Sequence, residues 1–221
     1  MNNIKTKKLI DLNNTFLDLT FEQFEYPWEI LPNINSIILK ILENPPKNYT
    51  LLKDGILIGK NVKISNTATI LPPVIIGDNT EIRHCAYLRG NVILLNNCVV
   101  GNSCELKNAI LFNDVQVPHF NYVGDSILGN HSHLGAGVIC SNLKTDKKNI
   151  IIKTDSMHIE TKLRKFGCII GDGVEVGCNS VLNPGTIICK NSRIYPLTNV
   201  RGVIAEELIV KSMQNIVKID D

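Results

Sequence analysis

A six-residue repeat of aliphatic residues constrains the fold of this chain more than any other feature. A helix repeats every 3.6 residues and a strand every two, so neither accounts for a strict period of six. The first run starts at Ile58 and the second at Ile170. Their members are Ile58, Ile64, Ile70, Ile76, Ile82, Leu88, Leu94, Val100 and Leu106, then Ile170, Val176, Leu182, Ile188, Ile194 and Val200.

The fifth position of each six-residue unit is small or β-branched, as at Ala68, Cys98 and Ser180. One short strand per unit and three units per triangular coil would place the aliphatic residue inside and the small residue near a corner. Glycines that directly follow the aliphatic residue, such as Gly77 and Gly101, are expected to adopt left-handed backbone geometry at turns. The repeat therefore predicts an all-β fold, a parallel β-helix, over residues 51–204, in preference to a β-sandwich with accidental periodicity.

The segments outside the repeat are expected to cap it. Residues 1–50 read as an N-terminal capping segment, whose helix after Leu31 stops before Pro45 and covers the open end of the prism. The aromatic residues of this segment are expected to pack against the first coil rather than form a binding patch; they are Phe21, Phe24, Tyr26 and Trp28. Residues 205–221 are interpreted as a short C-terminal helix.

Residues 112–169 interrupt the six-residue rhythm. Within them, residues 142–166 are rich in lysine and are expected to form a basic loop or hairpin inserted into the β-helix. Loops that leave a regular scaffold often carry function. Functional residues are therefore expected in this region.

Charge and composition exclude several partners. The net charge is +2, which provides no field for nucleic acid or an anionic membrane surface. No stretch approaches the ~20 apolar residues of a membrane span, and the first residues do not resemble a signal peptide, so a cytoplasmic location is expected. The seven cysteines form no C-x-x-C pair and are expected to be reduced.

Four motifs in the middle of the chain carry a family resemblance. They lie in Val100–Ala109, His119–Asp125, Leu134–Val138 and at Asn142. The chain resembles the hexapeptide-repeat acyltransferases, which fold as left-handed parallel β-helices. It is most similar to the acetyltransferase half of bifunctional glucosamine-1-phosphate acetyltransferase/N-acetylglucosamine-1-phosphate uridylyltransferase, and to the β-helical tails of archaeal sugar-1-phosphate nucleotidylyltransferases.

The resemblance implies a homotrimeric N-acetyltransferase that uses acetyl-CoA and an amino-sugar phosphate such as glucosamine-1-phosphate, in nucleotide-sugar biosynthesis. It makes His119 the general base, and an imidazole with an ordinary pKa of ~6.5 can accept an amine proton at neutral pH. It assigns substrate binding to Arg89, Glu105, Lys107, Tyr122, Asn142 and Lys148. Arg89 and Lys107 are eighteen residues apart, one full coil, so their side chains are expected to stack.

The resemblance also implies contacts of acetyl-CoA with Cys178 and Tyr195. Cys178 stands where the family usually has serine, and no arginine is assigned to the CoA phosphate. His131 and His133 have a spacing that could bind a metal, but a polar lining role is favoured and no metal is expected.

Two other functions remain open. One is a sugar-nucleotide-binding β-helix without acetyltransferase activity; the set Arg89, Lys107, His119 and Tyr122 argues against it. The other is a nucleotidyltransferase-related activity, against which the lack of a Gly-x-Gly-Thr-Arg-Met phosphate loop argues.

Overall fold

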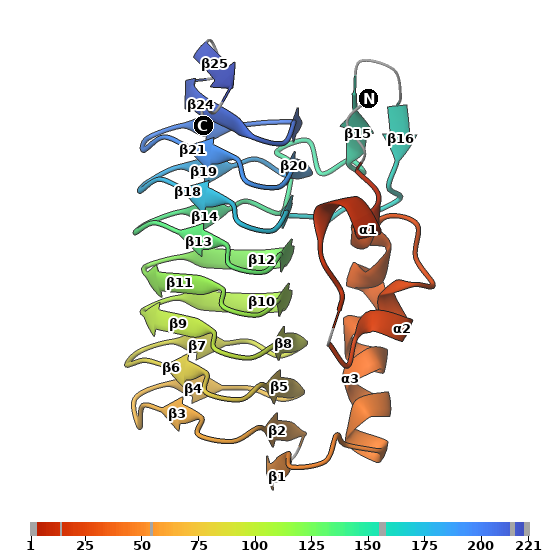
Figure 1. Ribbon diagram of the computed structural model, residues 1–221, viewed down its shortest axis with the longest axis vertical. Coiled ribbons are helices and arrows are strands. Elements are labelled where there is room, and N and C mark those ends of the chain that lie inside the picture. The colour runs from red at the N-terminus through yellow and green to blue at the C-terminus, as the bar shows by residue number, and fades with distance from the viewer. Residues whose placement is uncertain (1–3, 14, 54, 155–157, 213–214, 219–221) are drawn as a thin grey trace.

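The computed structural model describes residues 4–13, 15–53, 55–154, 158–212 and 215–218, and they form a parallel β-helix of about eight coils with helices along one side (Figure 1). Each complete coil supplies one strand to each of three faces, and equivalent strands of successive coils pair in parallel. The predicted all-β parallel β-helix of hexapeptide repeats is confirmed.

The strands are grouped by face. Face one contains β2 (Ile56–Ile58), β5 (Val74–Ile76), β8 (Val92–Leu94), β17 (Cys168–Ile170), β20 (Thr186–Ile188) and β23 (Val203–Ile204). Face two contains β3 (Lys63–Ile64), β6 (Glu81–Ile82), β9 (Val99–Asn102), β11 (Gln116–His119), β13 (His133–Leu134), β18 (Glu175–Val176), β21 (Arg193–Ile194) and β24 (Leu208–Ser212). Face three contains β4 (Thr69–Ile70), β7 (Tyr87–Leu88), β14 (Ile139–Cys140), β19 (Val181–Leu182) and β22 (Asn199–Val200). Two longer strands, β10 (Glu105–Leu111) and β12 (Tyr122–Leu128), run from face three into face one.

The interior of the β-helix is a column of stacked aliphatic side chains, as the repeat predicts. Ile76 pairs with Leu94, and both are fully buried. Beyond the first coil the small corner residues are buried as well, and polar ones bond to the backbone; the Thr80 hydroxyl donates to the Leu95 carbonyl at 2.9 Å. Cys98 is one of these corner residues, and burial raises the pKa of its thiol to about 12. The thiol is therefore uncharged and serves packing.

The prediction for the repeat glycines is wrong. Gly77 and Gly101 do not have positive φ; the left-handed positions lie two residues further on, at asparagines such as Asn61 and Asn79. The glycines are needed because the coils approach closely there. A Cβ on Gly101 would lie 1.6 Å from the Pro118 carbonyl oxygen.

The apparent break over residues 112–141 is a change of coil length. Glu105 pairs with Tyr122 and Tyr122 with Ile139, so two successive coils have 17 residues instead of 18. The inward aliphatic residues are therefore shifted by one position from Leu111 on and by two from Leu128 on. The true interruption is the later insertion. Ile127 pairs with Ile169 across 42 residues, because after β14 the chain leaves the coil and forms a hairpin of β15 (Ile151–Lys153) and β16 (His158–Glu160) before it returns.

The N-terminal segment lies along face one and does not cover the open end, so the predicted end cap is wrong. Its helices are α1 (Thr6–Leu9), α2 (Asp18–Phe21), the 3₁₀ helix η1 (Pro27–Asn33) and α3 (Ile34–Glu43). The middle residue of each face-one strand points outward and is apolar, and these residues form one buried cluster with the helices. They are Leu57, Ile75, Ile93, Ile110, Ile127, Ile169 and Ile187. This apolar strip determines where the segment packs (Figure 1).

The aromatic residues of this segment pack, as predicted, but not against the first coil. The Phe21 ring lies 5.3 Å from the Phe112 ring, and the Trp28 ring lies 5.9 Å from the Phe166 ring. These partners belong to the middle coils and to the base of the insertion. The segment therefore supports the same region of the β-helix that carries the motifs.

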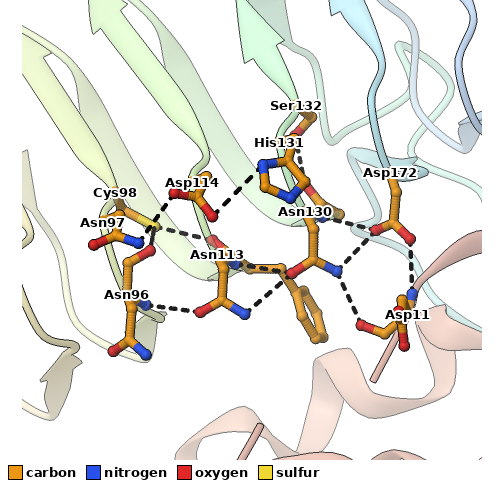
Figure 2. A network of polar contacts seen from close by, with 12 residues as sticks. Asp11, Asn96, Asn97, Cys98, Asn113, Asp114, Asn130, His131, Ser132 and Asp172 are labelled. Atoms are coloured by element: carbon orange, nitrogen blue, oxygen red, sulfur yellow. Dashed lines mark hydrogen bonds and ion pairs between the residues drawn. The ribbon is translucent and has the colours of Figure 1, made fainter. Parts of the chain in front are cut away.

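A ladder of side-chain amides follows the corner between faces one and two (Figure 2). The backbone N–H of Asn96 donates to Asn113 Oδ1, that of Asn113 to Asn130 Oδ1, and that of Asn130 to Asp172 Oδ1. The other Asp172 oxygen accepts the Asp11 N–H at 2.8 Å and forms an ion pair with Lys190. The ladder thus stabilises the stack and anchors the N-terminal segment.

The predicted C-terminal helix is wrong. Leu208–Ser212 continues face two as β24, and Asn215–Lys218 returns antiparallel as β25. The reason is that Val210 extends the interior column above Ile194 and is fully buried. Residues 213–214 and 219–221 of the predicted helix lie outside the described residues. Among the helices that the structure describes, none is both long and apolar enough to cross a membrane.

Candidate functional site

The H-x-x-Y-x-G-D motif turns the corner from face two to face three. His119 ends β11, Phe120 turns the chain with φ +53°, and Tyr122 begins β12. Asn121 points into the interior and is 2% exposed. The His119 backbone N–H donates to Asn121 Oδ1 at 3.1 Å, and Asn121 Nδ2 donates to the Gly135 carbonyl at 2.8 Å. The buried amide therefore fixes the backbone that presents His119.

The His119 imidazole is exposed at this corner. Within the described ranges, no hydrogen bond or ion pair occupies its ring nitrogens. A neutral imidazole has one nitrogen that can accept a proton, and solvent or a ligand can reach it here. The structure thus presents the exposed His119 ring on a backbone that Asn121 holds in place.

Arg89 and Lys107 lie side by side on face three. Tyr87 pairs with Glu105, and this register, continued by two residues, aligns Arg89 with Lys107 as expected from the spacing. Arg89 Nη1 lies 2.7 Å from Glu105 Oε1, and its guanidinium lies 5.9 Å from the centre of the Tyr87 ring. The hydrogen bond and the charge of Glu105 raise the pKa of Arg89. Glu105 therefore orients the guanidinium, and two cationic residues are neighbours on one face.

Tyr122 and Asn142 form the next part of this surface. Asn142 Nδ2 donates to the Tyr122 hydroxyl at 3.2 Å. Burial, followed by the charges of Asp125 and Glu105, raises the pKa of Tyr122 above its usual value. The phenol is consequently protonated at neutral pH and can donate a hydrogen bond.

Gly124 makes this arrangement possible. It follows Tyr122 by two residues on the same face, and a Cβ there would lie 2.5 Å from the Tyr122 hydroxyl oxygen and 2.8 Å from Asn142 Nδ2. Without a side chain at this position, the ring and the amide can meet over the strand.

We expect Gly124→Ala and Gly101→Ala to have different effects. At Gly124 the added methyl group meets the ends of two side chains, which can move, so stability falls by less than ~1 kcal/mol while Tyr122 leaves Asn142. At Gly101 it meets backbone, and the free energy of unfolding falls by about 3 kcal/mol or more. Urea unfolding of both variants and a crystal structure of Gly124→Ala would check this. Equal destabilisation, or an unmoved Tyr122, would contradict it.

Lys148 is not brought into this group of residues. It is exposed in the inserted segment, where its backbone N–H donates to Asp146 Oδ1 at 3.0 Å. In the described part of the chain, no contact joins its side chain to Arg89, Lys107 or Tyr122. A role for Lys148 in phosphate binding stays a prediction.

Cys178 and Tyr195 lie further along the edge that carries His119. Backbone hydrogen bonds connect successive coils at this corner: Gly137 N–H to the His119 carbonyl, Asn179 N–H to Ala136, and Leu197 N–H to Cys178. Cys178 is exposed and lies two coils beyond His119, and Tyr195 is 45% exposed one coil further. An extended ligand that reaches His119 could follow this edge to both residues.

His131 and His133 are engaged separately. His131 Nδ1 lies 3.5 Å from Asp114 Oδ2 in the amide ladder (Figure 2), and His133 Nδ1 lies 2.9 Å from Glu175 Oε2 on face two. Across the described ranges, no group of three or more histidine, cysteine or acidic residues could hold a metal ion.

A hollow of about 780 Å³, which the sequence did not predict, lies on face three beside Asn142. The inserted segment covers one side of it, and Ser141, Asn183 and Arg201 line the other. These three residues continue the column of Lys107 and Gly124 on face three, since the pairing of Val123 with Cys140 aligns Gly124 with Ser141. Residues of one column are 17 or 18 positions apart, not counting the inserted residues. This spacing could have identified Ser141, Asn183 and Arg201 from the sequence.

The chain is similar to several known proteins. Residues 70–194 match the family model described as the GMPPB C-terminal domain. The chain is 33% identical over 218 residues to a bifunctional protein GlmU of Methanococcus maripaludis, which covers 96% of this chain and 53% of that protein.

Two further relatives are informative. The chain is 35% identical over 111 residues to a bifunctional sugar-1-phosphate nucleotidylyltransferase/acetyltransferase of Sulfurisphaera tokodaii, covering 50% of this chain and 28% of that one. It is 33% identical over 181 residues to YaiX of Escherichia coli, described as an uncharacterized acetyltransferase, covering 72% of this chain and 77% of that one. The chain spans about half the length of the Methanococcus relatives.

Proposed function

This chain belongs to the GMPPB C-terminal domain family, and from that premise we propose that it is an acetyl-CoA-dependent N-acetyltransferase of an amino-sugar phosphate such as glucosamine-1-phosphate. The relatives from Sulfurisphaera tokodaii and Escherichia coli, both of which are named as acetyltransferases, support the reaction. The observation that carries the proposal is the placement of the exposed His119 at the corner beside the face that presents Arg89 and Lys107.

The reaction assigns a separate task to each part of the site. Arg89 and Lys107 hold the phosphate, since guanidinium and ammonium groups bind phosphate oxygens by charge-assisted hydrogen bonds. Tyr122 and Asn142 contact the sugar. His119 accepts a proton from the sugar amine as its nitrogen attacks the thioester carbonyl of acetyl-CoA.

The products follow from this step. A C–N bond forms and the C–S bond breaks, so the acetyl group leaves coenzyme A for the amine. The CoA thiolate takes up a proton and is released as the thiol. A backbone N–H stabilises the oxyanion that forms at the carbonyl. Acetyl-CoA lies along the edge of Cys178 and Tyr195, and we place Lys148 near the phosphate.

A homotrimer is part of the proposal. Exposed corners of a β-helix can form sites where neighbouring subunits meet, and closed symmetry is the usual form of homo-oligomers. In such an assembly face one is excluded from the contact, because the N-terminal segment covers its apolar strip. The trimer contact is therefore made by faces two and three.

We expect Lys107→Ala to weaken binding of glucosamine-1-phosphate by roughly 10-fold to 100-fold, because a hydrogen bond from a charged group is lost. Isothermal titration calorimetry would measure the dissociation constant. Lys63→Ala is the matched control, since Lys63 is exposed on face two of the first coil. Equal affinity of Lys107→Ala and wild type would remove Lys107 from the site, and no binding of any amino-sugar phosphate by wild type would overturn the proposed substrate class.

A further inference from the structure

Asp125 is a buried carboxylate with an unusual set of partners. The residue is 5% exposed and turns the corner from face three to face one with φ +48°. Its Oδ1 accepts Asn108 Nδ2 at 2.9 Å, and its Oδ2 accepts a short hydrogen bond from Asn142 Nδ2. Within the described ranges, no cation pairs with it. A buried charge without a cation needs such donors, because an unsatisfied one is strongly destabilising.

The partners of Asp125 connect three segments of the chain. Asn108 Nδ2 also donates to the Leu31 carbonyl of η1, at 3.2 Å. Asn142 begins the insertion, and Gly167 directly follows its end. The backbone N–H of Gly167 donates to the Asp125 carbonyl at 2.8 Å. Asp125 thus holds both ends of the insertion and, through Asn108, the N-terminal segment.

These contacts also determine which group donates and which accepts in each hydrogen bond around Asp125. The carboxylate and the Leu31 carbonyl can only accept, so the Asn108 amide must present its NH₂ group to both. The NH₂ group of Asn142 likewise faces Asp125 Oδ2 and the Tyr122 hydroxyl. Tyr122 therefore accepts from Asn142, which leaves its own O–H to donate to a ligand. Asn142 Oδ1 remains as an acceptor.

From this geometry we infer that Asp125 is a positioning residue that sets the polarity of the ligand-facing Tyr122 and Asn142 pair. The pair then offers one donor, the Tyr122 O–H, and one acceptor, Asn142 Oδ1. The donor fits a ring or phosphate oxygen of the ligand, and the acceptor fits a neighbouring sugar hydroxyl or amine. This inference rests on the proposed function for the identity of the ligand. The hydrogen bonds among Asp125, Asn108, Asn142 and Tyr122 do not depend on the proposed function.

Asparagine could not replace Asp125. Asn91 and Asn108 occupy the two preceding positions of the same corner, with φ +54° and +50°, so asparagine suits the backbone. At position 125 an amide has only one oxygen. Its NH₂ group would face the NH₂ group of Asn108 or Asn142, and one of the two hydrogen bonds would be lost.

The test compares Asp125→Asn with Asn91→Ala. The control removes the hydrogen bond from Asn35 Nδ2 to Asn91 Oδ1, which also joins the N-terminal segment to the β-helix. We expect Asp125→Asn to raise KM for the amino-sugar phosphate on the order of tenfold, as for loss of one charged hydrogen bond. KM for acetyl-CoA should not change. Amides around Asn142 and Gly167 should exchange with deuterium faster. Asn91→Ala should match wild type in all three.

A second variant separates polarity from general damage. In Asp125→Asn with Asn142→Asp, the amide at 125 can accept from Asn108 and donate to the carboxylate at 142. Slow exchange around positions 142 and 167 should therefore return. If Asp125→Asn leaves KM and exchange unchanged, or if the double variant fails to restore slow exchange, the inference is wrong. If wild type transfers no acetyl group, the proposed function fails, and the exchange results still decide the role of Asp125.

Discussion

Replacement of Ile82 by aspartate is expected to abolish folding. Ile82 is 1% exposed and lies in the interior column of face two. A carboxylate there would have neither water nor a cation, and such a buried charge costs several kcal/mol. Domains have a total stability of only about 5–15 kcal/mol, so most or all of it would be lost. Circular dichroism and urea unfolding of the purified variant would measure the loss.

Ile64→Asp is the matched control. Ile64 pairs with Ile82 in register but belongs to the first coil, where the residue is 37% exposed. Its carboxylate can reach water at the open end, so we expect a folded protein with a much smaller loss of stability. If Ile82→Asp proves soluble and as stable as Ile64→Asp, the interior column does not support the fold as described.

Removal of the His119 imidazole is expected to lower the turnover number for acetyl transfer by roughly 10²–10⁴-fold, the usual contribution of a general base. The fold should be unaffected, because the ring is exposed and Asn121 holds only its backbone. Steady-state release of CoA thiol by His119→Ala would give the turnover number. Circular dichroism would confirm that the variant is folded.

His131→Ala serves as the control for this experiment. His131 is another exposed histidine, with 71% of its side chain accessible, but it lies on the corner between faces one and two (Figure 2). Its removal should leave turnover unchanged. Full activity of His119→Ala, or equal losses in both variants, would mean that His119 is not the base.

The sequence predicts the solenoid well because interior packing imposes its period on every coil. Two errors arise where another constraint acts. At Gly101 the close backbone of the next coil requires glycine, although the turn is elsewhere. At Val210 the interior column continues into a strand, although the surrounding residues were compatible with a helix.

The face that the N-terminal segment covers can also be recognised in the sequence. Ile75 and Ile93 are apolar at outward positions, whereas the corresponding positions of face two include charged residues such as Glu81. An outward position that is apolar in successive coils therefore marks the covered face. A six-residue template that scores only inward positions misses this difference.

Of the proposed site, the column spacing predicts the alignment of Arg89 with Lys107. The spacing does not predict the roles of Gly124 and Asp125, because these depend on contacts with Asn142, which belongs to the inserted segment. Such contacts between distant parts of the chain follow from the fold and not from local pattern.

The most direct test of the proposed function is release of CoA thiol from acetyl-CoA by the purified wild-type protein. The assay would use a panel of amino-sugar phosphates, with the corresponding N-acetylated sugars as controls that have no free amine. We expect thiol release in equal amount to the amine acetylated, with glucosamine-1-phosphate or a near relative as the best substrate, and none with the acetylated controls. Thiol release no faster than background with every amino-sugar phosphate would contradict the account.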